Sequence, residues 1–334
     1  MKRKIIKQGH NTQTITLPSD WVKKLNLTNK DEVNITEKGD SLIISGHENL
    51  KEKTCVIDIT NFSIPLLWRY FQSAYRAGCD EIKIVFDQNQ KEYEDPYHYY
   101  TTQSDYAKLG EKIPTKTALA MIQSTVDRFL NIAIINTGKG YCIIKEMGEP
   151  TMKEFDNSLR RIFLVIFQMF DRIKEAIQDE DYGEVSICKE LHTIDLNVDK
   201  FVDYCCRIMN KIESSFSDHK KSLLFSTLFL LELLGDEFKY TGKHLAVSKK
   251  SLKNILPLIE KVREHFEIYY KLFYKFDREE SINLGKSDMD VYNYYFKVKG
   301  KFTGEEKSIG QHLMLIGKFT FALTELRIQM EYDF

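Results

Sequence analysis

Alternating apolar and polar positions near the start of the chain predict two β-hairpins around one short helix. In residues 12–17, Ile15 and Leu17 occupy one face and threonines the other, which is the period of a half-buried strand. Pro18 ends this strand because it has no N–H for the ladder, and Ser19 then N-caps a helix to about residue 25. A second hairpin follows, ending at residue 45. Residues 1–46 are too few to bury a core in one chain, so they predict a unit that depends on a partner.

The next part of the chain mixes both periods. We predict strands over 54–59, 81–86, 130–137 and 141–146, with helices over 63–77 and 115–129. A polar linker, 47–53, precedes this region, and a polar stretch over 87–105 interrupts it. The Gly138-Lys139-Gly140 triplet is a hairpin turn, because no G-x-G-x-x-G or Walker pattern surrounds it. Residues 54–149 therefore predict a small α/β domain.

From about residue 151 onward the apolar positions recur with the helical period. The predicted helices span 156–179, 184–213, 218–244, 248–276, 286–299 and 305–332. Pro257 predicts a kink in the fourth of them. Short connections favour antiparallel neighbours, so 151–334 predicts a helical bundle. The fold class is α+β multidomain, with domains at 1–46, 54–149 and 151–334.

Composition places the chain among ordinary globular proteins. Of its 334 residues 43% are hydrophobic and 29% charged, and the net charge is −1, so attraction to nucleic acid must come from local charge. Six cysteines form no C-x-x-C pair, which predicts reduced, half-buried thiols. The N-terminus lacks an apolar signal segment, and the most apolar run, 223–234, is shorter than a membrane span. We expect a cytoplasmic protein with no membrane insertion.

The first twelve residues contain a candidate nucleic-acid contact. The basic side chains that can neutralise phosphates are Lys2, Arg3, Lys4 and Lys7. The short polar groups that can bond phosphates or base edges are Gln8, His10, Asn11 and Thr12. Residues 1–46 contain eight Lys or Arg and five Asp or Glu, a net charge of only +3. The alternative is that this basic start is a solvated tail.

The runs KQGHNTQTITLPSDWVKKLNL and DEVNITEKGDSLIIS resemble the SpoVT-AbrB domain, most of all its archaeal version. This resemblance covers nearly all of residues 1–46. It implies a dimeric β-barrel in which hairpins from two chains interlock. It also implies that basic residues of the first strand and loop lie on double-stranded DNA.

Two acidic pairs fall on helical stripes of the predicted bundle. Asp195 lies on an apolar seam of its helix with Leu191, Val198 and Val202, and Asp199 lies one turn on. On the next helix, Glu232 and Asp236 have the same spacing, on a stripe that begins with Phe225 and Phe229. Four close carboxylates need counter-charge, which a divalent or iron-type metal ion could supply. The alternative is that they lie at the edge of the stripe, solvated or paired with Lys and Arg.

The runs KELHTIDLNVDKFVDYCCRIMNK and LLFSTLFLLELLGDEFKYTGKHLA resemble the PhoU helical domain. The resemblance covers roughly residues 151–332 and places the same four acids at the E/D-x-x-x-D pairs where some PhoU proteins hold metal. The chain departs from a two-repeat PhoU, because its last helices offer no clear second set of such pairs. The resemblance implies a role in phosphate uptake or homeostasis.

These patterns favour a dimeric, DNA-binding transcriptional regulator with a helical sensor or relay domain. The alternative is a PhoU-like adaptor that acts on a phosphate transporter, kinase or other signalling protein without binding DNA. A third interpretation is an antitoxin, which the large helical region disfavours. We expect no enzyme, because the sequence contains no nucleophile-base pattern, phosphate loop or His/Cys metal cluster.

Overall fold

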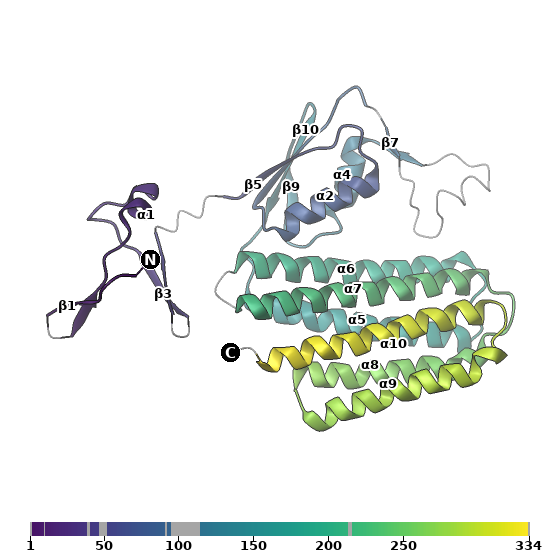
Figure 1. The fold of residues 1–334 in the computed structure, drawn as a ribbon. Helices are drawn as coiled ribbons and strands as arrows, with labels where there is room; N and C mark the ends of the chain where they lie inside the picture. The colour runs from purple at the N-terminus through teal and green to yellow at the C-terminus, as the bar shows by residue number, and fades with distance from the viewer. Residues whose placement is uncertain are drawn as a thin grey trace. The chain divides into compact units, whose positions relative to one another are not determined.

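The computed structural model describes residues 2–9, 11–38, 41–46, 52–90, 92–94, 114–212 and 216–332 (Figure 1). The chain divides into two compact units, residues 1–52 and 53–334, and each is described by itself. The predicted site residue His10, the predicted turn at Gly39 and most of the linker lie outside the described residues.

The N-terminal unit consists of two hairpins and one helix. Strands β1 (Ile6–Gln8) and β2 (Thr12–Thr14) pair antiparallel, helix α1 spans Ser19–Lys24, and β3 (Asn34–Lys38) pairs antiparallel with β4 (Ser41–Ser45). Gly9 has φ of +79° between β1 and β2, a conformation that favours glycine. Both hairpins and the helix are thus confirmed in number and order.

Two details of this unit differ from the prediction. The strand predicted over 12–17 ends at Thr14, because its partner β1 is only three residues long and leaves Ile15 without a ladder in one chain. Pro18, not Ser19, holds the N-cap position of α1, with no side-chain cap hydrogen bond. The two hairpins form separate two-stranded sheets among the described residues, so the closed barrel stays a prediction that needs a second chain.

The second unit begins with a four-stranded sheet of order β5-β6-β10-β9. Its strands are β5 (Thr54–Asp58), β6 (Glu81–Val85), β9 (Ile132–Gly138) and β10 (Tyr141–Glu146). The β5 and β6 strands are parallel, as the intervening helix α2 (Ile64–Arg76) requires, and the other neighbours are antiparallel. Figure 1 shows α2 and α4 (Ala118–Val126) on one side of the sheet, and the short pair β7 (Tyr93–Glu94) and β8 (Thr115–Lys116) lies beyond them.

Period-two alternation explains how this sheet meets its helices. Ile82, Ile84 and Ile144 are buried toward α2 and α4, where Leu67 and Phe71 of α2 are buried as well. The strand and helix predictions for this region are confirmed to within a few residues. We call this part the α/β domain.

The cysteine prediction was wrong for one pair. Cys55 on β5 and Cys79 just before β6 form a disulfide, with their Cα atoms 6.2 Å apart, because parallel strands β5 and β6 bring these distant positions side by side. Cys142, Cys188, Cys205 and Cys206 form no disulfide among the described residues, and they are fully buried where the sequence predicted half-buried thiols.

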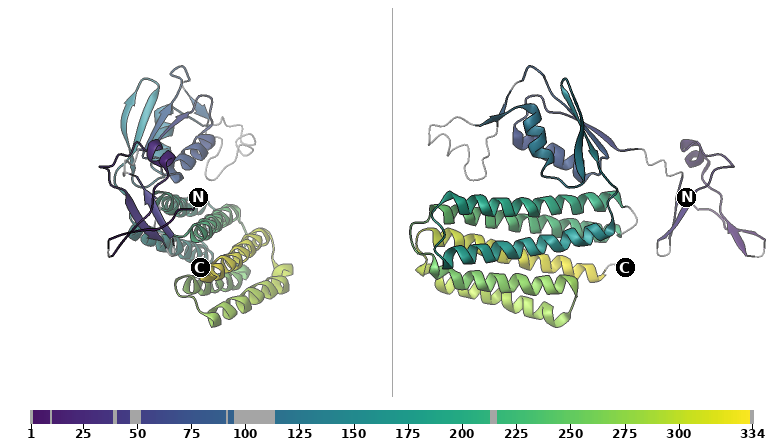
Figure 2. Two further views of the ribbon diagram at one scale, coloured as in Figure 1. Left: turned by 60° about the vertical axis from the view of Figure 1, so that its left-hand side comes forward. Right: turned by 180° about the vertical axis from the view of Figure 1, so that it is seen from behind.

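The rest of the second unit is a bundle of long helices (Figure 2). They are α5 (Met152–Gln178), α6 (Val185–Lys211), α7 (Asp218–Val247), α8 (Leu256–Tyr274), α9 (Arg278–Val298) and α10 (Glu305–Gln329), with 3-10 turns η1 (Lys253–Ile255), η2 (Lys299–Lys301) and η3 (Met330–Tyr332). Thr151 and Glu154 form a capping box that starts α5. No kink occurs at Pro257, which lies in the first turn of α8, where its missing N–H costs nothing.

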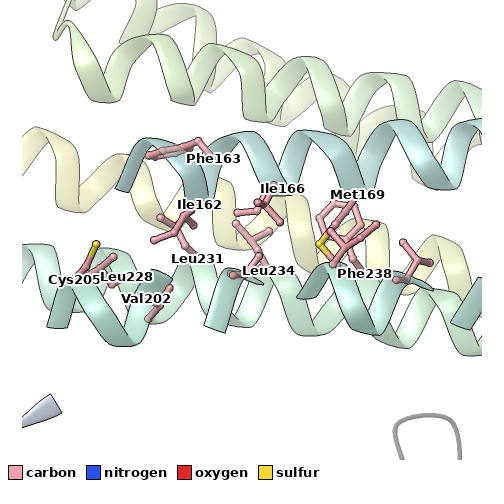
Figure 3. Packing of buried hydrophobic residues seen from close by; sticks show 14 of the residues in the cluster. Ile162, Phe163, Ile166, Met169, Val202, Cys205, Leu228, Leu231, Leu234 and Phe238 are labelled. Carbon is pink, nitrogen blue, oxygen red and sulfur yellow. The ribbon is translucent and has the colours of Figure 1, made fainter. Parts of the chain in front are cut away.

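The bundle core includes buried side chains of all six long helices, and Figure 3 draws the part that involves α5, α6 and α7. Ile162 and Ile166 of α5 pack with Val202 of α6 and with Leu231 and Leu234 of α7. None of the helices in the described part of the chain combines the length and the apolar character needed to span a membrane.

The predicted apolar stripe of α7 was wrong. Phe225 and Phe229 are exposed, while Leu224, Leu228 and Leu231 form the buried face. This helix is apolar on several sides, so the pattern alone did not distinguish the core face. Glu232 and Asp236 follow the exposed phenylalanines and therefore lie at the surface of the bundle, not in its core.

Candidate functional site

The β1–β2 hairpin presents most of the predicted DNA-contacting side chains. Its register pairs Lys7 with Gln13 and Gln8 with Thr12, so paired residues share a face and successive residues alternate. Gln8 and Thr12 thus lie on one face beside the tip, Lys7 lies on the other, and Asn11 lies at the turn. All of these side chains are exposed, so each is available to a ligand.

Lys2, Arg3 and Lys4 precede this hairpin in extended, exposed chain. They are therefore brought to the base of the hairpin, whereas Gln8, Asn11 and Thr12 gather at its tip. Amide and hydroxyl groups can bond both phosphate oxygens and base edges, while the ammonium and guanidinium groups add sequence-independent attraction to phosphate.

The N-terminal unit buries no side chain among its described residues. Its exposed large apolar side chains are Ile5, Ile6, Ile15, Leu25, Ile35, Leu42 and Ile43. This density of exposed aliphatic groups is far above that of a monomeric surface, where apolar residues are scattered singly. The described residues of the two hairpins therefore expose an apolar surface and form no buried core.

Comparison with known families agrees with this geometry. A family model described as "Antidote-toxin recognition MazE, bacterial antitoxin" matches residues 6–47. Residues 6–47 form a MazE/AbrB-type domain. The matched span includes both hairpins and α1. Searches of curated proteins and of solved structures find no match.

The second candidate site is the acidic face of α6 and α7. Asp195 is only 1% exposed, and its two oxygens have different surroundings: Oδ2 accepts a hydrogen bond from Lys239 Nζ at 3.1 Å, while Oδ1 has no hydrogen-bond partner among the described residues. Lys239 also donates to Asp236. Gly235 provides the space for Asp195, because a Cβ there would lie 2.5 Å from Oδ1.

Side chains of the α/β domain complete this face. Arg128, after α4, donates to Asp199 at 3.2 Å, and Arg76 of α2 donates from Nη2 to Glu232 at 3.0 Å. Arg76 Nε also donates to Asp203 at 2.5 Å. All four predicted metal ligands therefore have a basic partner, which is the pairing with Lys and Arg that the alternative named, and metal binding itself stays a prediction.

Burial dominates the ionisation of these acids. It raises the pKa of Asp195 to about 6 against the opposing charge of Lys239, and the pKa of Asp203 to about 6 against that of Arg76. Burial also raises the pKa of Asp199, with further elevation from Asp195 and Glu232. Among the described residues no three His, Cys, Asp or Glu side chains form a group suited to a metal ion.

Sequence reasoning missed a second ionic contact, in which the bundle supplies the cations. Arg207 of α6 is fully buried and donates to Glu146 of β10 and to the carbonyl oxygens of Tyr75 and Cys79. Lys211 pairs with Glu146 and with Asp80. The partners lie more than sixty residues from Arg207 and Lys211, so no local spacing in the sequence indicated these contacts. The sequence did contain a signal for Asp203, because it follows Asp195 and Asp199 at the same four-residue interval.

Proposed function

We propose that this protein is a DNA-binding transcriptional regulator whose MazE/AbrB-type domain contacts double-stranded DNA as a homodimer. The observation that supports this most directly is the exposed tip of the β1–β2 hairpin, with Gln8, Asn11 and Thr12 beside basic residues, in a domain of the MazE/AbrB type. The modest net charge of +3 indicates that turn contacts contribute much of the recognition.

The apolar surface supports the proposal of a second copy. A unit whose described residues bury no side chain does not by itself offset the entropy of folding. Pairing two copies brings the aliphatic groups of Ile6, Ile15 and Ile35 out of water. Equilibrium sedimentation of the full chain tests this: a monomer at micromolar concentration refutes the dimer.

DNA binding is tested by selecting sequences from a random duplex pool with the full-length protein, then measuring anisotropy on the selected duplex. We expect affinity that falls with salt and exceeds that for a scrambled duplex. Gln8→Ala/Asn11→Ala should reduce the preference for the selected sequence, whereas Lys2→Ala/Lys4→Ala should weaken both duplexes alike. Lys23→Ala/Lys24→Ala, on α1, is the charge-matched control for the lysine variant. If the pool yields no enrichment and no binding at low salt, the proposal is wrong.

An antitoxin is the second candidate function, because the family description names toxin recognition. The two functions separate in a growth assay with the gene next to this one. Rescue by residues 53–334 from a toxic neighbour favours the antitoxin, whereas a neighbouring gene without toxicity favours the regulator alone.

For the second unit we propose a sensor or relay role, supported by its resemblance to PhoU helical domains and by its forming a compact unit distinct from the N-terminal one. A phosphate-related signal follows from that resemblance alone. Transcript profiling of a deletion strain under phosphate limitation tests it, and unchanged phosphate-uptake genes contradict it. An adaptor on a phosphate transporter or kinase is the corresponding alternative, and in that case Lys2→Ala/Lys4→Ala leaves the phenotype unchanged.

A further inference from the structure

The acidic face of α6 and α7 has more carboxylates than the basic side chains of the bundle pair with. Its members are Asp195, Asp199, Asp203, Glu232 and Asp236. Lys239 of α7 pairs with Asp195 and Asp236. The other carboxylates pair with arginines that belong to the α/β domain, outside the bundle.

The two arginines are placed as fixed counter-ions. Arg76 lies between two helices, with Nε on Asp203 of α6 and Nη2 on Glu232 of α7, and only 18% of its side chain is exposed. Gln72, one turn earlier on α2, donates to the same Asp203 oxygen at 3.0 Å. A guanidinium held in this way is planar, permanently charged and directed at both carboxylates, so it neutralises them without a bound ion.

Arg128 is held from two sides. Its guanidinium lies over the Trp68 ring of α2 at 4.3 Å and donates to Asp199 at 3.2 Å. The stacking interaction reduces the freedom of the side chain before it reaches the carboxylate, and thus lowers the entropic cost of forming the ion pair.

We propose that Arg76 and Arg128 take the place of a metal ion on the acidic face of α6 and α7, so that docking of the α/β domain and divalent-cation binding there exclude each other. The acids that PhoU-like spacing would assign to a metal are here neutralised by a neighbouring domain. A divalent cation gains access only when that domain moves away, which makes the α/β domain a cationic cap on the bundle.

A second ionic contact, in which the charges are reversed, restricts where the α/β domain docks on α6. Arg207 and Lys211, near the end of α6, meet the acids Glu146 and Asp80 of the α/β domain. The bundle therefore supplies the cations of the contact near the end of α6, and the α/β domain supplies them at the middle of α6. Shifting the cap along α6 would place like charges together, so this alternation favours one docking position.

The first test measures Mn²⁺ binding to the full chain by calorimetry. Arg76→Gln/Arg128→Gln should bind Mn²⁺ at least about ten-fold more tightly than the unaltered chain, the size of a typical coupling between sites. Arg69→Gln/Arg161→Gln removes the same charge from exposed positions of α2 and α5 and should leave Mn²⁺ affinity unchanged. Adding Asp195→Asn to the first variant should abolish the gain. Equal affinity in the unaltered chain and the first variant overturns the proposal.

The second test needs no change at the contact. The chain has two tryptophans, so Trp21→Phe leaves Trp68 as the single reporter beside Arg128. Raising NaCl from about 0.1 to about 1 M shortens the Debye length from about 10 to about 3 Å. We expect acrylamide quenching of Trp68 to rise about two-fold and reversibly, with unchanged helical circular dichroism. Quenching that does not respond to salt overturns the ionic cap even if the arginine variant fails to fold.

Discussion

Two glycines inside helices test how tightly α6 and α7 are packed at the acidic face. Gly235 lies within α7, and a Cβ on it would meet Asp195 Oδ1 at 2.5 Å and Val198 Cγ1 at 3.4 Å. Gly285 lies within α9, and a Cβ there meets nothing within 4 Å. Both positions are helical, so Gly→Ala at each gains the same helix propensity of about 1 kcal/mol.

Because the propensity gain cancels between the two variants, their difference measures the steric cost alone. At Gly235 the Asp195 carboxylate must move by nearly an ångström while Lys239 holds its other oxygen, or the helices must separate. Such overpacking costs about 1–3 kcal/mol. We therefore expect Gly285→Ala to raise the free energy of unfolding by about 1 kcal/mol, and Gly235→Ala to change it by between about zero and −2 kcal/mol.

The assay is urea unfolding of the full chain, followed by circular dichroism at 222 nm, with the three proteins at one concentration. Equal m-values allow the midpoints to be compared directly. If Gly235→Ala is stabilised as much as Gly285→Ala, then α6 and α7 are not in close contact at Asp195, and the packing argument is refuted.

Three further predictions concern single side chains. Burial lowers the pKa of His265 to about 4, so the unfolded chain binds a proton at this histidine before the folded chain does. The free energy of unfolding should therefore fall by up to about 3 kcal/mol as the pH is lowered from about 6.5 to about 4. His265→Gln should remove this pH dependence in unfolding titrations, whereas His219→Gln, at an exposed position, should not. Thr151→Ala removes the capping box with Glu154 and should lower the unfolding free energy by about 1 kcal/mol, whereas an unchanged urea midpoint argues against the cap. Lys7→Ala should reduce the slope of log binding constant against log salt by about one for each phosphate that the variant no longer neutralises at a DNA site; an unaltered slope excludes a phosphate contact by Lys7.

Local periodicity was sufficient for most of the elements. The strands of the α/β domain and helices α5 to α7 alternate or repeat so regularly that their bounds follow from sequence, and the seam of α6 at Leu191, Val198 and Val202 is buried as predicted. The exposed face of α7 was predicted wrongly because this helix has apolar residues on several of its faces.

The contacts between the α/β domain and the bundle could not be predicted in this way. Arg76 and Asp203 are 127 residues apart, and nothing in either local sequence pairs them. The disulfide between Cys55 and Cys79 depends likewise on the parallel pairing of β5 and β6. The metal prediction rested on the need for positive charge, and the sequence did not show that arginines from another domain could supply it.

The lack of buried side chains among the described residues of the N-terminal unit has a consequence for gene dosage. A segment that gains its core only by pairing folds by a bimolecular reaction, so the folded fraction follows the law of mass action. Halving the cellular amount of such a protein lowers the number of competent DNA-contacting units by more than half while pairing is far from saturation. For the proposed homodimeric regulator, occupancy of a DNA target would therefore respond steeply to the rate at which the protein is synthesised.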